Sequence, residues 1–442
     1  MTFSTINPRA IAGSAQVADG NANRPASTLI DGVDPRALAR HVSTPAHLYS
    51  AGVMRERLNA LKVALADVNA SICYAVKANS SLAILQWMNQ AGVGADIVSA
   101  GELERCLRAG MPPSRIVFSG VGKTEVEIAT ALEAGISRFN VESVDELHSV
   151  NAIAGNLGVL AHAAVRINPD VDARTHAKIS TGKAENKFGV SIAEARSWFA
   201  RHRDWPHARL DGLHVHIGSQ IQQLDPFVAA LQRVAAFWRE LEHDGHAIAS
   251  IDVGGGLGVR YRDADNPPAA ADYVGAIRQA LAGFRGLIVL EPGRWLIAEA
   301  GMLLTRVIRI KHGESRNFLV LDAAMNDLAR PSLYDAWHDI VPVVADPGRA
   351  PVTYDIVGPV CESGDTFARD RVLPECRAGE LLLIRATGAY GASMSSTYNS
   401  RPLAAEVLLD DGCFAVIRRA QTFEEMTAGE QPATDWVKPG TW

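Results

Sequence analysis

Eight short apolar runs, each followed by a stretch of helical composition, constrain the fold of this chain more than any other feature. The runs begin near positions 71, 93, 115, 137, 161, 210, 250 and 286. Continuous apolar runs bounded by turn residues are typical of buried parallel strands. Several of the stretches between them end on a glycine suited to a helix C-cap. Eight repeats of strand and helix predict an α/β fold of the (β/α)8, TIM-type barrel class.

After about residue 305 the pattern changes to closely spaced strand-like segments. These segments predict a second, C-terminal β domain of the sandwich or barrel type. The expected organisation is therefore a partly disordered segment over 1–45 that partly joins the β domain, a barrel over 46–305, and the β domain over 306–442. A chain of 442 residues is long enough for two hydrophobic cores.

The composition argues against several classes of partner. With 43 basic and 49 acidic residues, the net charge of -6 gives no electrostatic reason to expect nucleic acid or a membrane surface. No run approaches the roughly 20 apolar residues that span a bilayer, and the first residues lack a signal-peptide pattern. The five cysteines form no C-x-x-C pair, which favours reduced thiols. We therefore expect a cytoplasmic protein that acts on small molecules.

The stretch "SICYAVKANSS" places Lys77 at the end of the first barrel strand. Barrels of this type carry their chemistry at the carboxyl ends of the strands. A lysine amine that is partly desolvated there is expected to have a lowered pKa and to attack an aldehyde. Pyridoxal phosphate is the cofactor that uses such a lysine. It also needs a phosphate cradle, a partner for its pyridine nitrogen, a group against its ring and a proton donor for the reaction.

Two later strand ends supply the first of these groups. Gly254, Gly255 and Gly256 follow the seventh strand in "DVGGGLGV", where their backbone N–H groups can approach an anion. Their spacing does not match the G-x-G-x-x-G pattern of dinucleotide sites. The eighth strand ends in "LEPGRW", in which Glu291 can keep the pyridine nitrogen protonated and Arg294 can bind phosphate or carboxylate.

The sixth strand and a turn of the β domain supply the rest. In "HVHIGSQ", His214 and His216 share a face, but a zinc site is disfavoured because no third ligand follows at a suitable spacing, so we expect no metal. Stacking on the cofactor suits His216, with Ser219 near the phosphate. Cys361 lies in the polar turn "GPVCESGD" and is the candidate proton donor.

Ten ordered motifs resemble those of the diaminopimelate decarboxylases, a family in the alanine-racemase-like, fold-type III class of pyridoxal-phosphate enzymes. Among them are "YAVKANSS", "GADIVSAGELE", "GLHVHIGSQI", "EPGRWLIAEAG", "DIVGPVCESGDTFA" and "GAYGASMSSTYNSRP". The resemblance runs from about residue 45 to about residue 425. It implies decarboxylation of meso-2,6-diaminopimelate to L-lysine and carbon dioxide, the last step of lysine biosynthesis.

The resemblance also implies roles for individual residues. Lys77 would carry the cofactor covalently, His216 would stack on its ring, and Glu291 would face the pyridine nitrogen. Arg294 would hold the phosphate together with the three glycines. Tyr390, in "GAYG", would lie near both cofactor and substrate.

A homodimer follows from the same resemblance, because this class pairs two chains so that Cys361 and Glu362 of one complete the active site of the other. The unreacted end of diaminopimelate carries a carboxylate and an ammonium, so its recognition needs both signs of charge. Arg294 and Arg330, with the hydroxyl of Tyr334, can bind the carboxylate, and Glu362 can bind the ammonium.

Three alternatives stay open on the sequence alone. A decarboxylase for ornithine, lysine or a carrier-bound amino acid would keep nearly all these motifs. A racemase would lack the proton-donor turn, and a regulatory homologue without activity would be expected to lose Lys77, Glu291 or Cys361, all of which are present. The polar segment 178–190 could close as a lid.

Overall fold

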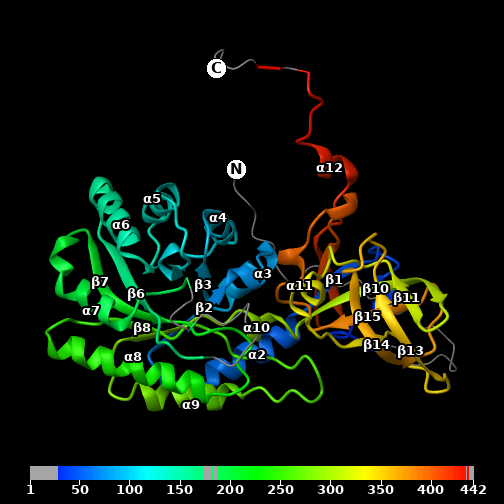
Figure 1. The fold of residues 1–442 in the computed structure, drawn as a ribbon, viewed down its shortest axis with the longest axis horizontal. Helices are drawn as coiled ribbons and strands as arrows, with labels where there is room; N and C mark the ends of the chain where they lie inside the picture. The colour runs from blue at the N-terminus through cyan, green and yellow to red at the C-terminus, as the bar shows by residue number, and fades with distance from the viewer. Residues whose placement is uncertain (1–27, 173–181, 183–186, 435, 438–442) are drawn as a thin grey trace.

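The computed structural model describes residues 28–172, 182, 187–434 and 436–437. Figure 1 shows a barrel ringed by helices beside a strand-rich domain, with α12 (Phe423–Thr427) extending away from both. The predicted fold class is confirmed. In the described part of the chain, no helix combines the length and apolar character needed to traverse a bilayer.

The barrel consists of eight parallel strands, and each of them is one of the eight predicted runs. It closes where the first strand pairs with the last, with Ala70 opposite Ile288. The strands are β2 (Ala70–Ala75), β3 (Gly94–Ile97), β4 (Ile116–Phe118), β5 (Arg138–Val141), β6 (Ala161–Ile167), β7 (Ala208–Val215), β8 (Ser250–Asp252) and β9 (Leu287–Leu290).

Each barrel strand is followed by a helix, and α2 (Ala51–Ala64) leads into the first strand. Polar N-caps start several of these helices: Thr124 and Glu127, for example, form a reciprocal capping box. The helices are α3 (Leu82–Gln90), α4 (Ala100–Arg108), α5 (Glu125–Ala134), α6 (Val144–Leu157), α7 (Ile192–Ala200), α8 (Asp225–His243), α9 (Ala270–Ala280) and α10 (Arg294–Ile297).

The second domain is built on a nine-stranded sheet that includes the strand before the barrel. β1 (Ala46–Ser50) pairs antiparallel with β10 and parallel with β16, although its residues lie in the range expected for the barrel. The other strands are β10 (Gly301–His312), β11 (Asn317–Leu321), β12 (Ile340–Pro342), β13 (Pro351–Val357), β14 (Thr366–Pro374), β15 (Leu381–Arg385), β16 (Ala405–Asp410) and β17 (Cys413–Arg418).

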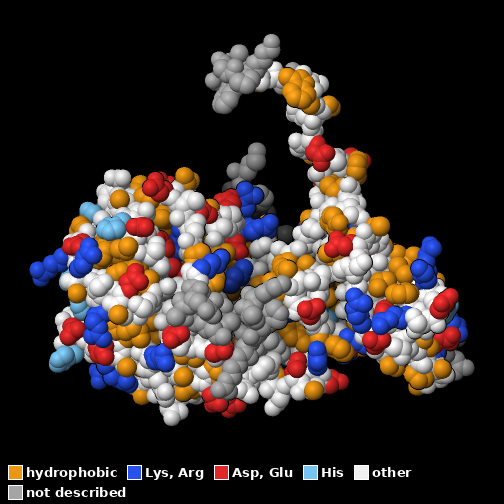
Figure 2. Space-filling view, viewed as in Figure 1, with side chains coloured by type: hydrophobic (Ala, Val, Ile, Leu, Met, Phe, Trp, Pro, Cys, Tyr) orange, Lys and Arg blue, Asp and Glu red, His pale blue; other side chains and the backbone are white. Residues whose placement is uncertain are grey.

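The described residues before β1 also pack on this sheet. Helix α1 (Pro35–Leu38) contributes Leu38 to a core that includes Ile30, Leu48 and Val407. The larger core lies in and around the barrel. Figure 2 shows acidic and basic side chains interspersed over both domains on the face in view.

Candidate active site

A cavity of about 500 Å³ opens at the carboxyl ends of the barrel strands, where the β domain meets the barrel. Its volume is in the range typical of small-molecule sites. Most of the residues predicted from the sequence line it: Lys77, His216, Ser219, Gly256, Glu291 and Arg294 from the barrel, and Arg330, Tyr334 and Tyr390 from the C-terminal region.

Lys77 lies in the short 3₁₀ turn Val76–Ala78 that ends β2. Its Nζ donates a hydrogen bond to Oδ2 of Asp96, at the end of β3, over 2.9 Å. Burial alone would lower the pKa of Lys77, but the negative charges of Asp96 and Glu291 outweigh burial and raise it. The predicted lowering of this pKa is therefore wrong, because the sequence reasoning did not identify the neighbouring carboxylate.

His216 follows β7 and faces the cavity as a neutral ring. Its Nδ1 accepts a hydrogen bond from the N–H of Gly255 at 3.2 Å, which requires a lone pair on that nitrogen. Burial, with the positive charges of Arg166 and Lys77, lowers the pKa of His216 to about 3. A flat, uncharged imidazole is suited to lie against an aromatic cofactor.

Glu291 directly follows β9 and is held by polar side chains at or near the ends of other strands. Its Oε1 accepts hydrogen bonds from Ser119 Oγ at 3.3 Å and from Asn140 Nδ2 at 3.2 Å. Burial would raise the pKa of Glu291, but His214, whose Nε2 is 3.4 Å from Oε2, and Lys77 lower it below its usual range. The carboxylate is therefore ionised and able to face a protonated ring nitrogen.

His214, in β7, and His216, just after it, do not belong to one group of potential metal ligands among the described residues. His214 lies with Asp252 and Glu291, whose potential ligand atoms are all within 4.8 Å of one another, and His216 is not part of this group. Hydrogen bonds already engage the acids: Asp252 Oδ1, for example, accepts the N–H of Gly254 at 2.8 Å. Burial and the nearby Glu291 raise the pKa of Asp252, so that a protonated Asp252 can share its proton with Glu291.

Gly256, Ser219 and Arg294, the residues expected to bind phosphate, all line the cavity. Nε of Arg294 donates to Ser219 Oγ at 3.1 Å, and no acceptor for the Gly256 N–H lies among the residues that the structure describes. A Cβ on Gly256 would lie 2.2 Å from the carbonyl oxygen of Gly218, and one on Gly255 would lie 2.1 Å from that of Glu291. The glycines therefore bring this loop close to its neighbours, although only Gly256 lines the cavity.

Two arginines face the cavity without a neutralising acid. Arg294 donates from Nη1 to the hydroxyl of Tyr261 at 2.6 Å, and its guanidinium lies 4.9 Å from the ring centre of Tyr390. The guanidinium of Arg330 lies 4.6 Å from the ring centre of Tyr261. Neither arginine forms an ion pair with a carboxylate of the described residues, which leaves both charges available to an anionic ligand. Tyr261 was not predicted from the sequence. The one feature that could have pointed to it is its position as an aromatic residue shortly after the glycine loop.

Cys361 and Glu362 do not line this cavity. Both are exposed in the turn after β13, where Glu362 lies close to Tyr398. Their proposed roles require a second chain and stay predictions. Most of segment 178–190, whose polar composition would allow it to close as a lid, lies outside the described residues.

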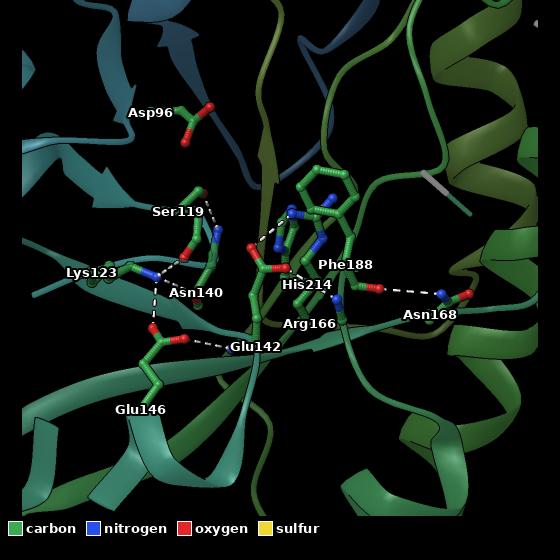
Figure 3. Close-up of polar contacts among 12 residues, drawn as sticks. Asp96, Ser119, Lys123, Asn140, Glu142, Glu146, Arg166, Asn168, Phe188 and His214 are labelled. Carbon is green, nitrogen blue, oxygen red and sulfur yellow. Dashed lines mark hydrogen bonds and ion pairs between the residues drawn. The ribbon is translucent and has the colours of Figure 1, made fainter. Parts of the chain in front are cut away.

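Two buried ion pairs lie near the carboxyl ends of the barrel strands. Figure 3 shows Lys123 bonded to Glu146, and Arg166 bonded to Glu142, across the ends of β4, β5 and β6. The charged atoms are 2.6 Å and 2.8 Å apart, respectively. Such pairs are costly to break because removal of one partner leaves a buried charge. These ion pairs were not predicted, since they join segments that are separate in the sequence.

Comparisons of this chain with known proteins all identify the same family. Residues 51–298 match the model of the pyridoxal-dependent decarboxylases, pyridoxal binding domain. The diaminopimelate decarboxylase of Pseudomonas aeruginosa is 48% identical over 407 residues, which are 92% of this chain and 97% of that protein. The diaminopimelate decarboxylase of Zymomonas mobilis is 47% identical, over 90% of this chain and 95% of that protein.

Among solved structures, this chain is similar to the diaminopimelate decarboxylase of Helicobacter pylori complexed with L-lysine. The two are 42% identical, with a TM-score of 0.86 over 89% of this chain and 98% of the other.

Proposed function

The chain belongs to the diaminopimelate decarboxylase family of pyridoxal-dependent enzymes, and from this membership we propose that it converts meso-2,6-diaminopimelate to L-lysine and carbon dioxide, the last step of lysine biosynthesis. One observation carries the proposal. The same cavity holds a lysine amine at a barrel strand end and two arginines that no described acid neutralises. An amine suits an aldehyde cofactor, and the arginines suit a substrate with a second carboxylate.

The residues present fit pyridoxal phosphate. The open N–H of Gly256, with Ser219 and Arg294, can bind the phosphate, and the neutral ring of His216 can lie against the cofactor ring. When bound, the cofactor supplies an aldehyde for the substrate amine and an electron-withdrawing ring that makes loss of the carboxylate feasible.

The chain's own groups then position the substrate and move protons. Glu291, ionised and fixed by its hydrogen bonds, would hold a proton on the ring nitrogen, and its removal should slow release of carbon dioxide. Arg330 and Tyr334 would hold the distal carboxylate. Lys77 would release the product.

The reaction also needs a proton for the carbon that loses carbon dioxide. We propose that Cys361 donates it, that Glu362 binds the distal ammonium, and that both reach the site of the partner chain in a homodimer. Both residues are exposed and neither lines the cavity of its own chain, which supports this arrangement. Loss of Cys361 should stall or misdirect the protonation. The expected location is the cytoplasm.

The test is to incubate the purified holoenzyme separately with meso-diaminopimelate, ornithine and lysine and to measure carbon dioxide. A site built to pair with a substrate carboxylate should favour diaminopimelate by at least about a hundredfold in kcat/KM. A preference for ornithine would refute the assignment of the arginines and favour a decarboxylase for another amino acid.

A further inference from the structure

Arg330 begins α11 (Arg330–Tyr334) and is only 6% exposed, yet its hydrogen-bonding partners are the imidazole of His338 and the hydroxyl of Tyr261, neither of which is a carboxylate. Its Nη1 lies 2.9 Å from Nε2 of His338, which is itself 1% exposed. A buried guanidinium is ordinarily paired with a carboxylate. Within the described ranges no carboxylate plays that part, so the contact with His338 needs an explanation.

The chemistry of the two groups fixes the state of His338. A guanidinium has only donors, so Nε2 of His338 must accept and cannot carry a proton. The proton of a neutral ring is then on Nδ1, which lies 2.8 Å from the carbonyl oxygen of Arg385 and donates to it. Burial and the charge of Arg330 lower the pKa of His338 to about 3, in agreement with a neutral ring.

Tyr261 restrains the same pair from the barrel side. The rings of Tyr261 and His338 are nearly perpendicular, with their centres 5.3 Å apart, and the guanidinium of Arg330 lies over the Tyr261 ring. The hydroxyl of Tyr261 accepts a hydrogen bond from Nη1 of Arg294. The direction of Arg330 is therefore set by a neutral acceptor on one side and an aromatic ring on the other.

A neutral acceptor at this position has a different effect from an acid. Aspartate or glutamate would also direct Arg330, but it would form an ion pair, cancel the positive charge and occupy the donors that a ligand needs. A neutral imidazole fixes the direction and leaves the charge unmatched. A desolvated, unmatched cation gains most from a ligand that brings its own carboxylate.

We propose that His338 is a positioning residue that sets ligand selectivity: it holds Arg330 toward the cavity without neutralising it, so that ligands with a distal carboxylate are preferred over those with a distal ammonium alone. The inference rests on the proposed function for the identity of the ligand. It concerns a residue that does not itself line the cavity.

The test compares two ligands that differ by one carboxylate, L-lysine and 1,5-diaminopentane. Their dissociation constants from the holoenzyme are read from the cofactor absorbance, which requires no turnover. In His338→Leu, L-lysine should bind about tenfold or more weakly and 1,5-diaminopentane within about threefold of wild type, so that the selectivity ratio falls. The KM for diaminopimelate should rise while kcat changes little.

Two further variants separate positioning from simple disruption of the fold. His338→Gln keeps a neutral acceptor and should retain the wild-type selectivity ratio for L-lysine over 1,5-diaminopentane. His338→Glu places an acceptor of the same size as glutamine there but adds a negative charge, and the selectivity should be lost. If His338→Leu does not fold, the comparison of His338→Gln with His338→Glu is sufficient to test the inference. An unchanged ratio in His338→Glu, or a lost ratio in His338→Gln, would overturn the inference. Wild-type enzyme that binds L-lysine selectively but releases no carbon dioxide from diaminopimelate would overturn the proposed function instead.

Discussion

At the scale of single residues, the pairing of Lys77 with Asp96 bears directly on the proposed attachment of the cofactor. The amine and the carboxylate lie 2.9 Å apart, and Asp96 is fully buried. The pair keeps Lys77 protonated before the cofactor arrives, because a nearby negative charge stabilises the ammonium form. Attachment of an aldehyde requires the neutral amine, so the pair must lose a proton first.

Replacement of Asp96 by asparagine should therefore shift cofactor attachment to lower pH. The charge that raises the pKa of Lys77 is removed, burial remains, and the neutral amine becomes available at a lower pH. The measurement is the rate at which apoenzyme incorporates pyridoxal phosphate, followed by absorbance as a function of pH. Asp272→Asn, at an exposed position of α9, is the control. An unchanged pH profile in Asp96→Asn would show that Asp96 does not control the amine.

At the scale of elements, the loop after β8 packs tightly against the residue that follows β9, beside the proposed phosphate site. Gly255 donates its N–H to His216, and its Cα lies so close to β9 that a methyl group would sit 2.1 Å from the carbonyl oxygen of Glu291. Real Cβ atoms do not approach a backbone oxygen so closely, so either the loop or the strand end would have to move.

Gly255→Ala should accordingly weaken cofactor binding by about tenfold or more and destabilise the enzyme by about 1–3 kcal/mol, as overpacking of a tight interior does. Gly275→Ala is the matched control, because Gly275 lies within α9 and an added Cβ would meet nothing within 4 Å. That variant should be stabilised by about 0.5–1 kcal/mol. Cofactor titration and thermal unfolding measure both effects. Wild-type affinity in Gly255→Ala would contradict the close approach.

At the scale of the whole molecule, the sequence was sufficient for features that depend on local pattern. The eight barrel strands follow from apolar runs, and the placement of Lys77, His216 and Glu291 at one mouth follows from the rule that parallel strands end on the same side. Interactions between distant segments were not accessible in this way. The contact of Lys77 with Asp96 reversed the expected direction of a pKa shift, and β1 joined a sheet whose other strands begin at Gly301.

The contacts of Tyr261 and His338 were also missed, for the same physical reason. Each residue is unremarkable within its own segment, and its role appears only when the barrel and the β domain meet at the cavity. Arg330 could be predicted as a binding residue from the sequence, because a charged residue in a polar motif suggests a ligand of opposite charge. No comparable pattern marks the neutral group that directs it.

A dimer with shared sites makes a prediction of its own. Lys77→Ala and Cys361→Ala homodimers should each be nearly inactive. If they are mixed under conditions that exchange chains, about half the dimers become mixed and each mixed dimer has one intact site, so that about a quarter of wild-type activity should return. Formation of L-lysine by the mixture measures this, because a misdirected protonation would still follow release of carbon dioxide. Failure of activity to return despite confirmed exchange of chains would place Cys361 and Lys77 in the same chain's site.

The most direct test of the account is borohydride reduction of the holoenzyme, followed by proteolysis and mass spectrometry. We predict that the reduced cofactor is found on the peptide that contains Lys77 and that Lys77→Ala retains none after denaturation. Reduced cofactor on another lysine, such as Lys123, or wild-type protein that stays unlabelled, would contradict the assignment of this barrel mouth as the site of reaction.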